Sequence, residues 1–236
     1  MTGPFWLTAF LDLPADRYDA GLAFWEGVTG YQRSAPRGEH DEFVSLLPTD
    51  GDDFLRVQRL ADGPARIHLD VHVAELPDSG EDRGGYVTTT SPGGLVFCYV
   101  RHPAATRPAP RDWGGHASLV DQVCLDIPPT AYDDECAFWQ RLTGYELVHR
   151  DGSEFSSLVR PPRIPLRLLL QRLDQGDGPV SAHLDLATSD RARETTRQLE
   201  LGARLEQVNE HWTVLVDPAG LRYCLTDRDP ETGMLG

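Results

Sequence analysis

The sequence predicts an α+β protein made of two tandem domains, each assembled from paired β-α-β-β-β units. The first observation is an internal repeat: residues 24–31 read Phe-Trp-Glu-Gly-Val-Thr-Gly-Tyr, and residues 138–145 read Phe-Trp-Gln-Arg-Leu-Thr-Gly-Tyr. Three landmarks recur in the same order, at residues 11–14 and 125–128, 57–60 and 170–173, and 68–70 and 183–185. The distance between copies is far longer than a solenoid unit and suits a small domain, so it indicates tandem domain duplication.

The first unit of the second half begins with a strand over residues 119–127, because Val123, Leu125 and Ile127 alternate with polar residues. A helix follows, with Thr130 as its predicted N-cap, an apolar face at helical spacing, and Gly144 at its end. Apolar runs then predict three more strands, at residues 146–149, 155–159 and 166–171.

The second unit of this half repeats the same order of elements. Residues 182–187 alternate as a strand that turns His183 and Asp185 to one face. A helix over residues 191–201 is ended by Gly202. Further strands are predicted at residues 204–208, 213–216 and 222–225.

The first half differs in its second unit, which lacks a helix. The stretch from residue 68 to residue 98 is shorter than its counterpart from 183 to 224, and the missing residues fall where the helix belongs. Residues 77–85 stand there instead, and they are too rich in glycine and charge to form a packed helix. We therefore expect the other domain or a partner subunit to cover one sheet face of the N-terminal domain.

The domain boundaries follow from composition. Three prolines, Pro103, Pro108 and Pro110, precede a Trp-Gly-Gly sequence without hydrophobic periodicity. We place an N-terminal domain at residues 1–102, a Pro/Gly-rich linker at 103–118, and a C-terminal domain at 119–236.

Charge and composition exclude several classes of partner. A net charge of −15 disfavours nucleic acid and anionic membranes, because both are repelled over most of the surface. No apolar run reaches the ~18 residues of a membrane helix, and no signal-peptide pattern is present, so we expect a cytoplasmic protein. The four cysteines form no Cys-x-x-Cys pair and are expected to be free thiols.

The paired units, the Phe-Trp…Gly-Tyr helix end, the His-Leu-Asp strands and a closing Asp-Pro-Ala-Gly-Leu-Arg-Tyr-Cys at residues 217–224 resemble the vicinal oxygen chelate (VOC) superfamily. This superfamily includes glyoxalases, bleomycin resistance proteins and dioxygenases, and the chain is most similar to the actinobacterial glyoxalase-like domain. The resemblance spans nearly the whole chain and implies that each domain forms a cup of curved sheet. It does not fix the reaction, because one fold supports many functions.

The resemblance also implies where ligands would be held, on the first, fourth, fifth and last strands of a domain. In the second half these positions are Gln122, Gln171, His183 and Cys224. In the first half they are Thr8, Gln58, His68 and Cys98. Metal-using relatives usually carry His or Gln, then Glu, then His, then Glu, so this chain departs at the fourth and last strands.

This departure changes the metal that the site would accept. A hard ion such as Mg²⁺ prefers carboxylate oxygens, whereas His183, Gln122 and Cys224 suit a weakly bound Zn²⁺ or Fe²⁺ better. Asp185 could supply the missing carboxylate, because it lies on the same strand face as His183. By the same alternation the first half offers His68, Asp70 and His72.

Structural roles are the alternatives for several of these residues. A His-x-Asp pair on a strand is often a hydrogen-bonded pair that contacts no ligand. Trp25 and Trp139 are most simply core residues that pack helix on sheet. Cys98 and Cys224 could be small buried apolar side chains.

Three functions remain open. The first is a binding protein that holds a small organic molecule, aromatic or antibiotic-like, in a cup without a strong metal site. Its candidate ligand-binding residues are Gln122, Gln171, Trp212, Cys224, His68 and Asp70. The second is a lyase, isomerase or dioxygenase that uses a weak divalent metal, or His183 and Asp185 as an acid–base pair. The third is that one half is a degenerate scaffold, with the working site in the second half. A homodimer is one expected assembly.

Overall fold

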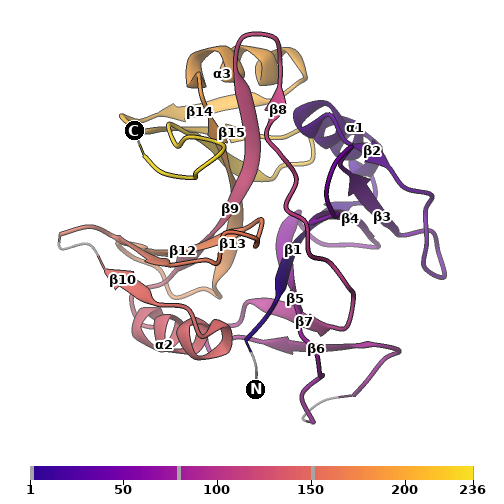
Figure 1. Cartoon of the computed structure of the whole chain (residues 1–236), viewed down its shortest axis with the longest axis vertical. Helices are drawn as coiled ribbons and strands as arrows, with labels where there is room; N and C mark the ends of the chain where they lie inside the picture. Colours follow the sequence, from indigo (N-terminus) through magenta and orange to yellow (C-terminus); the bar gives the residue numbers. More distant parts are fainter. Residues whose placement is uncertain (1–2, 79–80, 150–151, 236) are drawn as a thin grey trace.

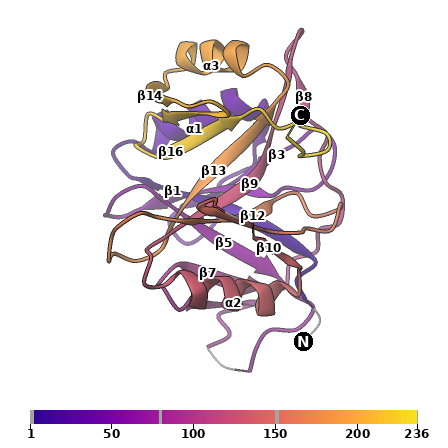
Figure 2. The same cartoon turned by 90° about the vertical axis from the view of Figure 1, so that its left-hand side faces the viewer.

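The computed structural model describes residues 3–78, 81–149 and 152–235. It contains two mixed sheets, one from each half of the chain, with helices packed where the halves meet (Figures 1 and 2). The predicted fold class, α+β with two tandem halves, is confirmed.

The N-terminal sheet has seven strands in the order β2-β3-β4-β1-β5-β7-β6. Its strands are β1 (Trp6–Pro14), β2 (Gln32–Arg33), β3 (Phe43–Leu47), β4 (Leu55–Leu60), β5 (Arg66–His72), β6 (Tyr86–Thr90) and β7 (Val96–Val100). The central strand β1 pairs in parallel with β4 and antiparallel with β5. One helix, α1 (Tyr18–Thr29), connects β1 to β2.

The C-terminal sheet has nine strands, eight of them in the order β10-β11-β12-β9-β13-β16-β15-β14, with β8 paired to β9. They are β8 (Arg111–Asp112), β9 (Ala117–Ile127), β10 (Leu147–His149), β11 (Phe155–Leu158), β12 (Arg167–Arg172), β13 (Ser181–Thr188), β14 (Arg204–Val208), β15 (Trp212–Val216) and β16 (Arg222–Thr226). The helices of this half are α2 (Tyr132–Thr143) and α3 (Arg191–Glu200).

Two local features differ from the sequence prediction. The predicted N-cap of α2, Thr130, is wrong, because the helix begins at Tyr132 with Ala131 at the cap. A preceding turn, closed by a 3.0 Å hydrogen bond from the Ala131 amide to the Pro128 carbonyl, displaces the helix start by one residue. Within the predicted linker, β8 forms a short hairpin with the start of β9.

Each long helix packs against the sheet of the other half. The α1 side chains Phe24 and Trp25 contact Tyr223 of β16, with ring centres 5.9 and 5.3 Å apart. Gly21 permits this approach, because a Cβ there would lie 2.9 Å from the Cβ of Ala219. Trp25 is 1% exposed and its counterpart Trp139 is fully buried, so their predicted role in the core is confirmed.

The helix missing from the N-terminal half is replaced by α2. Residues 73–78 and 81–85, described between β5 and β6, form no helix. The helix α2 instead lies beside β7 (Figure 2). Phe97 of β7 packs on Phe138 and Trp139 of α2, with ring centres 5.8 and 5.3 Å apart. The other domain therefore covers this face of the N-terminal sheet, which is one of the two possibilities expected from the sequence.

Two further features concern the cysteines and the length of the helices. All four cysteines are buried free thiols, as predicted. Among the described residues, no helix is long and apolar enough to cross a membrane.

Candidate functional site

The C-terminal sheet curls around a cavity of about 660 Å³. This volume lies within the range of small-molecule pockets. Six predicted site residues, drawn from the five strands β9, β12, β13, β15 and β16, line it together: Gln122, Gln171, His183, Asp185, Trp212 and Cys224. The cavity also receives Gly233, Met234 and Leu235 from the C-terminal segment.

The floor of the cavity holds an imidazole between two carboxylates. His183 Nδ1 lies 3.0 Å from Asp126 Oδ2, and His183 Nε2 lies 3.4 Å from Asp185 Oδ1. Strand alternation on β13 turns His183 and Asp185 to the same face, and pairing with β9 places Cys124 opposite His183. Two neighbouring strands, β9 and β13, therefore supply the imidazole and both carboxylates.

Both partners of this pair favour the ionised form. Burial lowers the pKa of His183, but Cys124, Asp126 and Asp185 outweigh burial and hold that pKa well above its ordinary value. Burial raises the pKa of Asp185, but the His183 imidazolium outweighs it and the pKa is lowered. Without a metal, the floor can therefore hold and donate a proton at His183.

Gln122 links Asp185 to Arg167 through the two ends of its amide. Its Nε2 donates to Oδ2 of Asp185, while its Oε1 accepts a 2.8 Å hydrogen bond from Arg167 Nε. Arg167 Nη2 also donates to the carbonyl of Gly233, at 3.2 Å. Its amide oxygen has a second lone pair, so Gln122 could coordinate an ion only while it also accepts from the positively charged Arg167, which would weaken it as a metal ligand.

Two overlapping groups of residues could hold a metal ion, and both contain His183. The ligand atoms of His183, Asp185 and Cys224 lie within 4.8 Å of one another, as do those of Cys124, Asp126 and His183. Asp185 Oδ1 is buried and accepts no hydrogen bond, so it fits an unfilled ligand position. One nitrogen, one carboxylate oxygen and one sulfur suit Zn²⁺ or Fe²⁺ better than Mg²⁺.

Burial raises the pKa of the Cys224 thiol. A metal that coordinates this sulfur must therefore displace a proton, which weakens binding as pH falls. Asp126 would support such a site, because its hydrogen bond with Nδ1 of His183 would leave the other ring nitrogen, Nε2, to coordinate an ion.

Two aromatic rings form part of the cavity wall. Phe155 of β11 and Trp212 of β15 meet edge to face, with ring centres 6.0 Å apart. Four strands separate β11 from β15 in the sheet, so the curvature of the sheet brings these two rings together. Both side chains are half-buried and both line the cavity.

The first half holds its predicted residues His68 and Asp70 on strand β5 of the N-terminal sheet. His68 Nδ1 lies 2.9 Å from Asp12 Oδ1, which repeats the His183–Asp126 contact. Phe10 stacks on His68, with ring centres 4.5 Å apart and planes 11° apart. Arg56 Nη1 lies 3.7 Å from Asp70 Oδ2, and burial raises the pKa of Asp70 to about 6.

Sequence reasoning missed Asp126, Cys124, Phe155 and Arg167 as residues of the cup. A signal for Asp126 was present, because the repeated Leu-Asp-x-Pro landmark contains Asp12 in one half and Asp126 in the other. No pattern indicated Phe155 or Arg167, whose placement depends on the curvature of the sheet.

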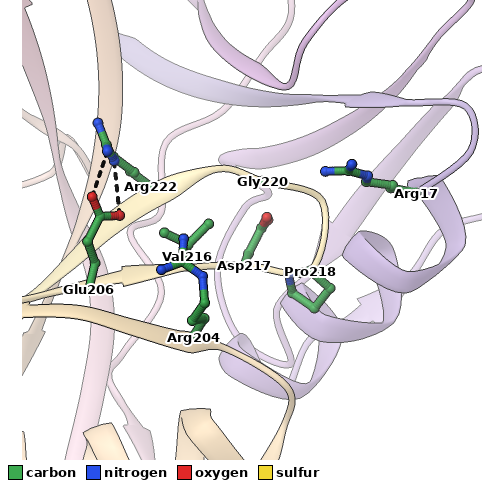
Figure 3. Close-up of a pocket in the computed structure, with 8 residues that line it drawn as sticks. All are labelled: Arg17, Arg204, Glu206, Val216, Asp217, Pro218, Gly220 and Arg222. Atoms are coloured by element: carbon green, nitrogen blue, oxygen red, sulfur yellow. Dashed lines mark hydrogen bonds and ion pairs between the residues drawn. The ribbon is translucent and has the colours of Figure 1, made fainter.

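A second concavity, of about 480 Å³, lies outside the cup between α1 and the turn from β15 to β16 (Figure 3). Arg222 donates two hydrogen bonds to Glu206 at its edge, at 2.6 and 3.1 Å, and Arg17 approaches from the α1 side. No histidine or cysteine lines it. The cup is therefore the stronger candidate for a functional site.

The two curved sheets and their paired units are the architecture of the VOC superfamily. Residues 8–100 and 122–226 match the model of the glyoxalase-like domain, and the chain belongs to this family. A comparison with curated proteins finds no match.

Solved structures support the fold assignment. The chain is similar to the Mn(II)-bound glyoxalase from Novosphingobium aromaticivorans, with 16% identity and a TM-score of 0.63 over 99% of this chain and 87% of that one. A triple mutant of 4-hydroxymandelate synthase from Streptomyces coelicolor gives 14% identity and a TM-score of 0.63, covering 98% and 94%. The 2,3-dioxygenase LapB from Pseudomonas sp. KL28 gives 14% and 0.63, covering 96% and 93%. At these identities the likeness shows the fold alone.

Proposed function

We propose that the C-terminal cup binds a small organic molecule and that the N-terminal cup is a scaffold filled by its own side chains. The observation that carries this proposal is that two large side chains of the first half are replaced by smaller ones in the second half. Strand pairing places Phe10 and Arg56 side by side in the first half, and Cys124 and Leu169 in the same positions of the second. The two smaller side chains leave a cavity where the first half has a ring and a guanidinium.

The lining of the cup suits an organic ligand with both apolar and polar parts. Phe155, Trp212 and Leu169 offer apolar contacts, whereas His183 and Asp185 offer hydrogen bonds and charge. A few polar groups within an otherwise apolar pocket are typical of small-molecule sites.

Methionine-methyl NMR tests this function directly. The chain has two methionines, and Met234 lines the cup, so its ¹³C-methyl signal can be assigned with Met234→Leu. We expect members of a fragment library to shift this signal. Cys124→Phe should abolish the shifts by placing a ring in the cavity, whereas Val208→Phe, on the exposed strand β14, should retain them. Shifts that survive Cys124→Phe would contradict the proposal.

A second candidate function is a metal-dependent reaction in the same cup, with His183, Asp185 and Cys224 as ligands. The buried Oδ1 of Asp185, which accepts no hydrogen bond from the described residues, favours it, and the glyoxalase from Novosphingobium aromaticivorans is a Mn(II)-bound relative by fold. A bound divalent ion would supply Lewis acidity toward a substrate oxygen. Asp126 would orient His183, and Gln122 would orient Asp185.

Elemental analysis by mass spectrometry, before and after incubation with Zn²⁺, Fe²⁺, Mn²⁺ or Ni²⁺, tests the metal function. We expect near-stoichiometric metal that is lost in His183→Ala and retained in His40→Ala, since His40 is exposed and lies outside the cup. Metal content that is equal in the two variants would reject the site. A cytoplasmic location and a homodimeric assembly remain predictions from the sequence.

A further inference from the structure

Side chains of the N-terminal cup occupy a space that is open in the C-terminal cup, and they indicate what could fill it. In the β1–β5 pair Phe10 lies opposite His68, and its ring stacks on that imidazole. In the β9–β13 pair Cys124 lies opposite His183. The imidazole is therefore retained in the second half, and the ring that covers it is not.

The same comparison identifies a missing cation. In the first half Arg56 lies beside Phe10, with its Cζ 5.9 Å from the ring centre and its Nη1 3.7 Å from Asp70. In the second half Leu169 takes the place of Arg56. Asp185 follows His183 as Asp70 follows His68, so the carboxylate is kept while the guanidinium is lost.

Two carboxylates lie beside His183 in the open cup. Asp126 and Asp185 flank His183, so this group of three carries one net negative charge even when the imidazole is protonated. Asp185 is 3% exposed, and its Oδ1 accepts no hydrogen bond. His183 Nε2 lies 3.4 Å from that oxygen, and a ligand donor would add a direct hydrogen bond to it.

Three arginines also line the cavity. Arg228 pairs with Asp121 and also interacts electrostatically with Asp185. Arg222 donates to Glu206, and Arg167 donates to Gln122 and to the Gly233 carbonyl. Trp212 also lines the cavity, and tryptophan is the residue type whose ring face attracts cations most strongly.

We propose that the C-terminal cup takes a flat aromatic ligand that carries an amidinium or guanidinium group. Its ring stacks on His183 in the space that Phe10 fills in the other half, and its cation pairs with Asp185 as Arg56 pairs with Asp70. This inference rests on the proposed binding function and names the chemical class of the ligand.

Benzamidine is the probe, and neutral benzamide and anionic benzoate are its matched controls. Each is titrated into the full-length protein, with the Met234 methyl signal as the readout. We expect benzamidine to bind at least tenfold more tightly than benzoate, with benzamide between them. Asp185→Asn should weaken benzamidine binding at least tenfold, and Asp53→Asn, which removes a carboxylate of the first half, should leave it unchanged.

Leu169→Arg provides a second variant that does not depend on the folding of Asp185→Asn. It introduces the guanidinium of the first half into the second cup, so we expect benzamidine binding to be lost and the melting temperature to be maintained. Benzoate binding as tight as benzamidine binding, or benzamidine binding unchanged in Leu169→Arg, would overturn the inference. Library fragments that shift Met234 while benzamidine does not would overturn it and leave the proposed binding function standing.

Discussion

The indole nitrogen of Trp25 donates a 2.8 Å hydrogen bond to Oδ2 of Asp217, a residue of the opposite half of the chain. Trp139 makes the related bond in the second half, but its acceptor is Glu135 of its own helix, at 2.7 Å. Glu135 also accepts from the Gly93 amide in the turn between β6 and β7. Each half thus fastens its first helix to the other half through a tryptophan and a carboxylate.

Trp25→Phe should lower the free energy of unfolding by about 1–3 kcal/mol, because it removes the donor from a buried carboxylate. Asp217 keeps its 2.8 Å bond from the Leu221 amide, so the turn itself should persist. Chemical denaturation of Trp25→Phe, Asp217→Asn and the double variant measures the coupling. Additive losses would show that the contact contributes no stability of its own.

We expect that the carboxylate that accepts from Trp139 can be moved from its helix, at Glu135, to the turn between β6 and β7, at Ser91. Ser91 occupies the turn position of Asp217 and accepts from the Leu95 amide as Asp217 accepts from Leu221. Glu135→Gln should destabilise the protein by about 1–3 kcal/mol, because it weakens the acceptors of two buried donors. Adding Ser91→Asp should recover part of this loss.

The control for this exchange is Ser91→Asp alone, which should destabilise the protein by placing a second carboxylate near Glu135. Thermal melting of the three variants at neutral pH is sufficient. A double variant less stable than Glu135→Gln would contradict the equivalence of the two turns.

His72 should make stability depend on pH. Its Nδ1 donates to the His102 carbonyl at 2.8 Å, so its Nε2 accepts from the Thr8 hydroxyl at 2.9 Å and the ring is neutral. Burial lowers the pKa of His72 to about 4. Because the unfolded chain binds this proton near pH 6.5, the contribution of His72 is complete above that pH and is lost as pH falls toward 4.

We expect the difference in unfolding free energy between the natural protein and His72→Gln to change by up to about 3 kcal/mol between pH 7 and pH 4. Urea denaturation at four pH values measures it. Curves that remain parallel over this range would mean that His72 binds its proton equally in both states.

Arg197 joins both halves through the geometry of its guanidinium. It donates to the carbonyls of Gly27 and Val28 at the end of α1, each at 2.9 Å, and forms a close ion pair with the buried Glu194. Its Cζ also lies 3.7 Å from the ring centre of Trp113. A lysine cannot reproduce these planar contacts.

Arg197→Lys should therefore cost about 1–3 kcal/mol of stability. Arg193→Lys is the matched control, because it makes the same change on the exposed side of α3 and should cost less than about 0.5 kcal/mol. Equal losses in the two variants would show that the planar contacts contribute little.

Most of the fold was predictable from local pattern. Alternation located β9 and β13, helical spacing located α2, and glycines marked the ends of α2 and α3; Gly144, for example, has φ of 70° after α2. The helix missing from the first half followed from length and composition. The predicted N-cap Thr130 was wrong because a backbone turn, which no side-chain preference signals, displaced the start of the helix.

The candidate site was predictable only in part. The repeat and the strand alternation brought His183 and Asp185 to one face, as the structure also has them. Phe155 and Trp212 lie far apart in sequence and in strand order, so only the curvature of the sheet joins them. The engagement of Gln122 by Arg167 likewise depends on side-chain packing between strands.

The sequence by itself determined that the chain is a tandem duplication of a small α+β domain, because period and polarity are local properties that repeat along the chain. Only the tertiary structure decided which cup is open. Phe10 and Cys124 are both compatible with a buried strand, and their different effects arise from the volume that each leaves over a histidine on the neighbouring strand. Cavity volume depends on packing between strands, and no pattern within one strand encodes it.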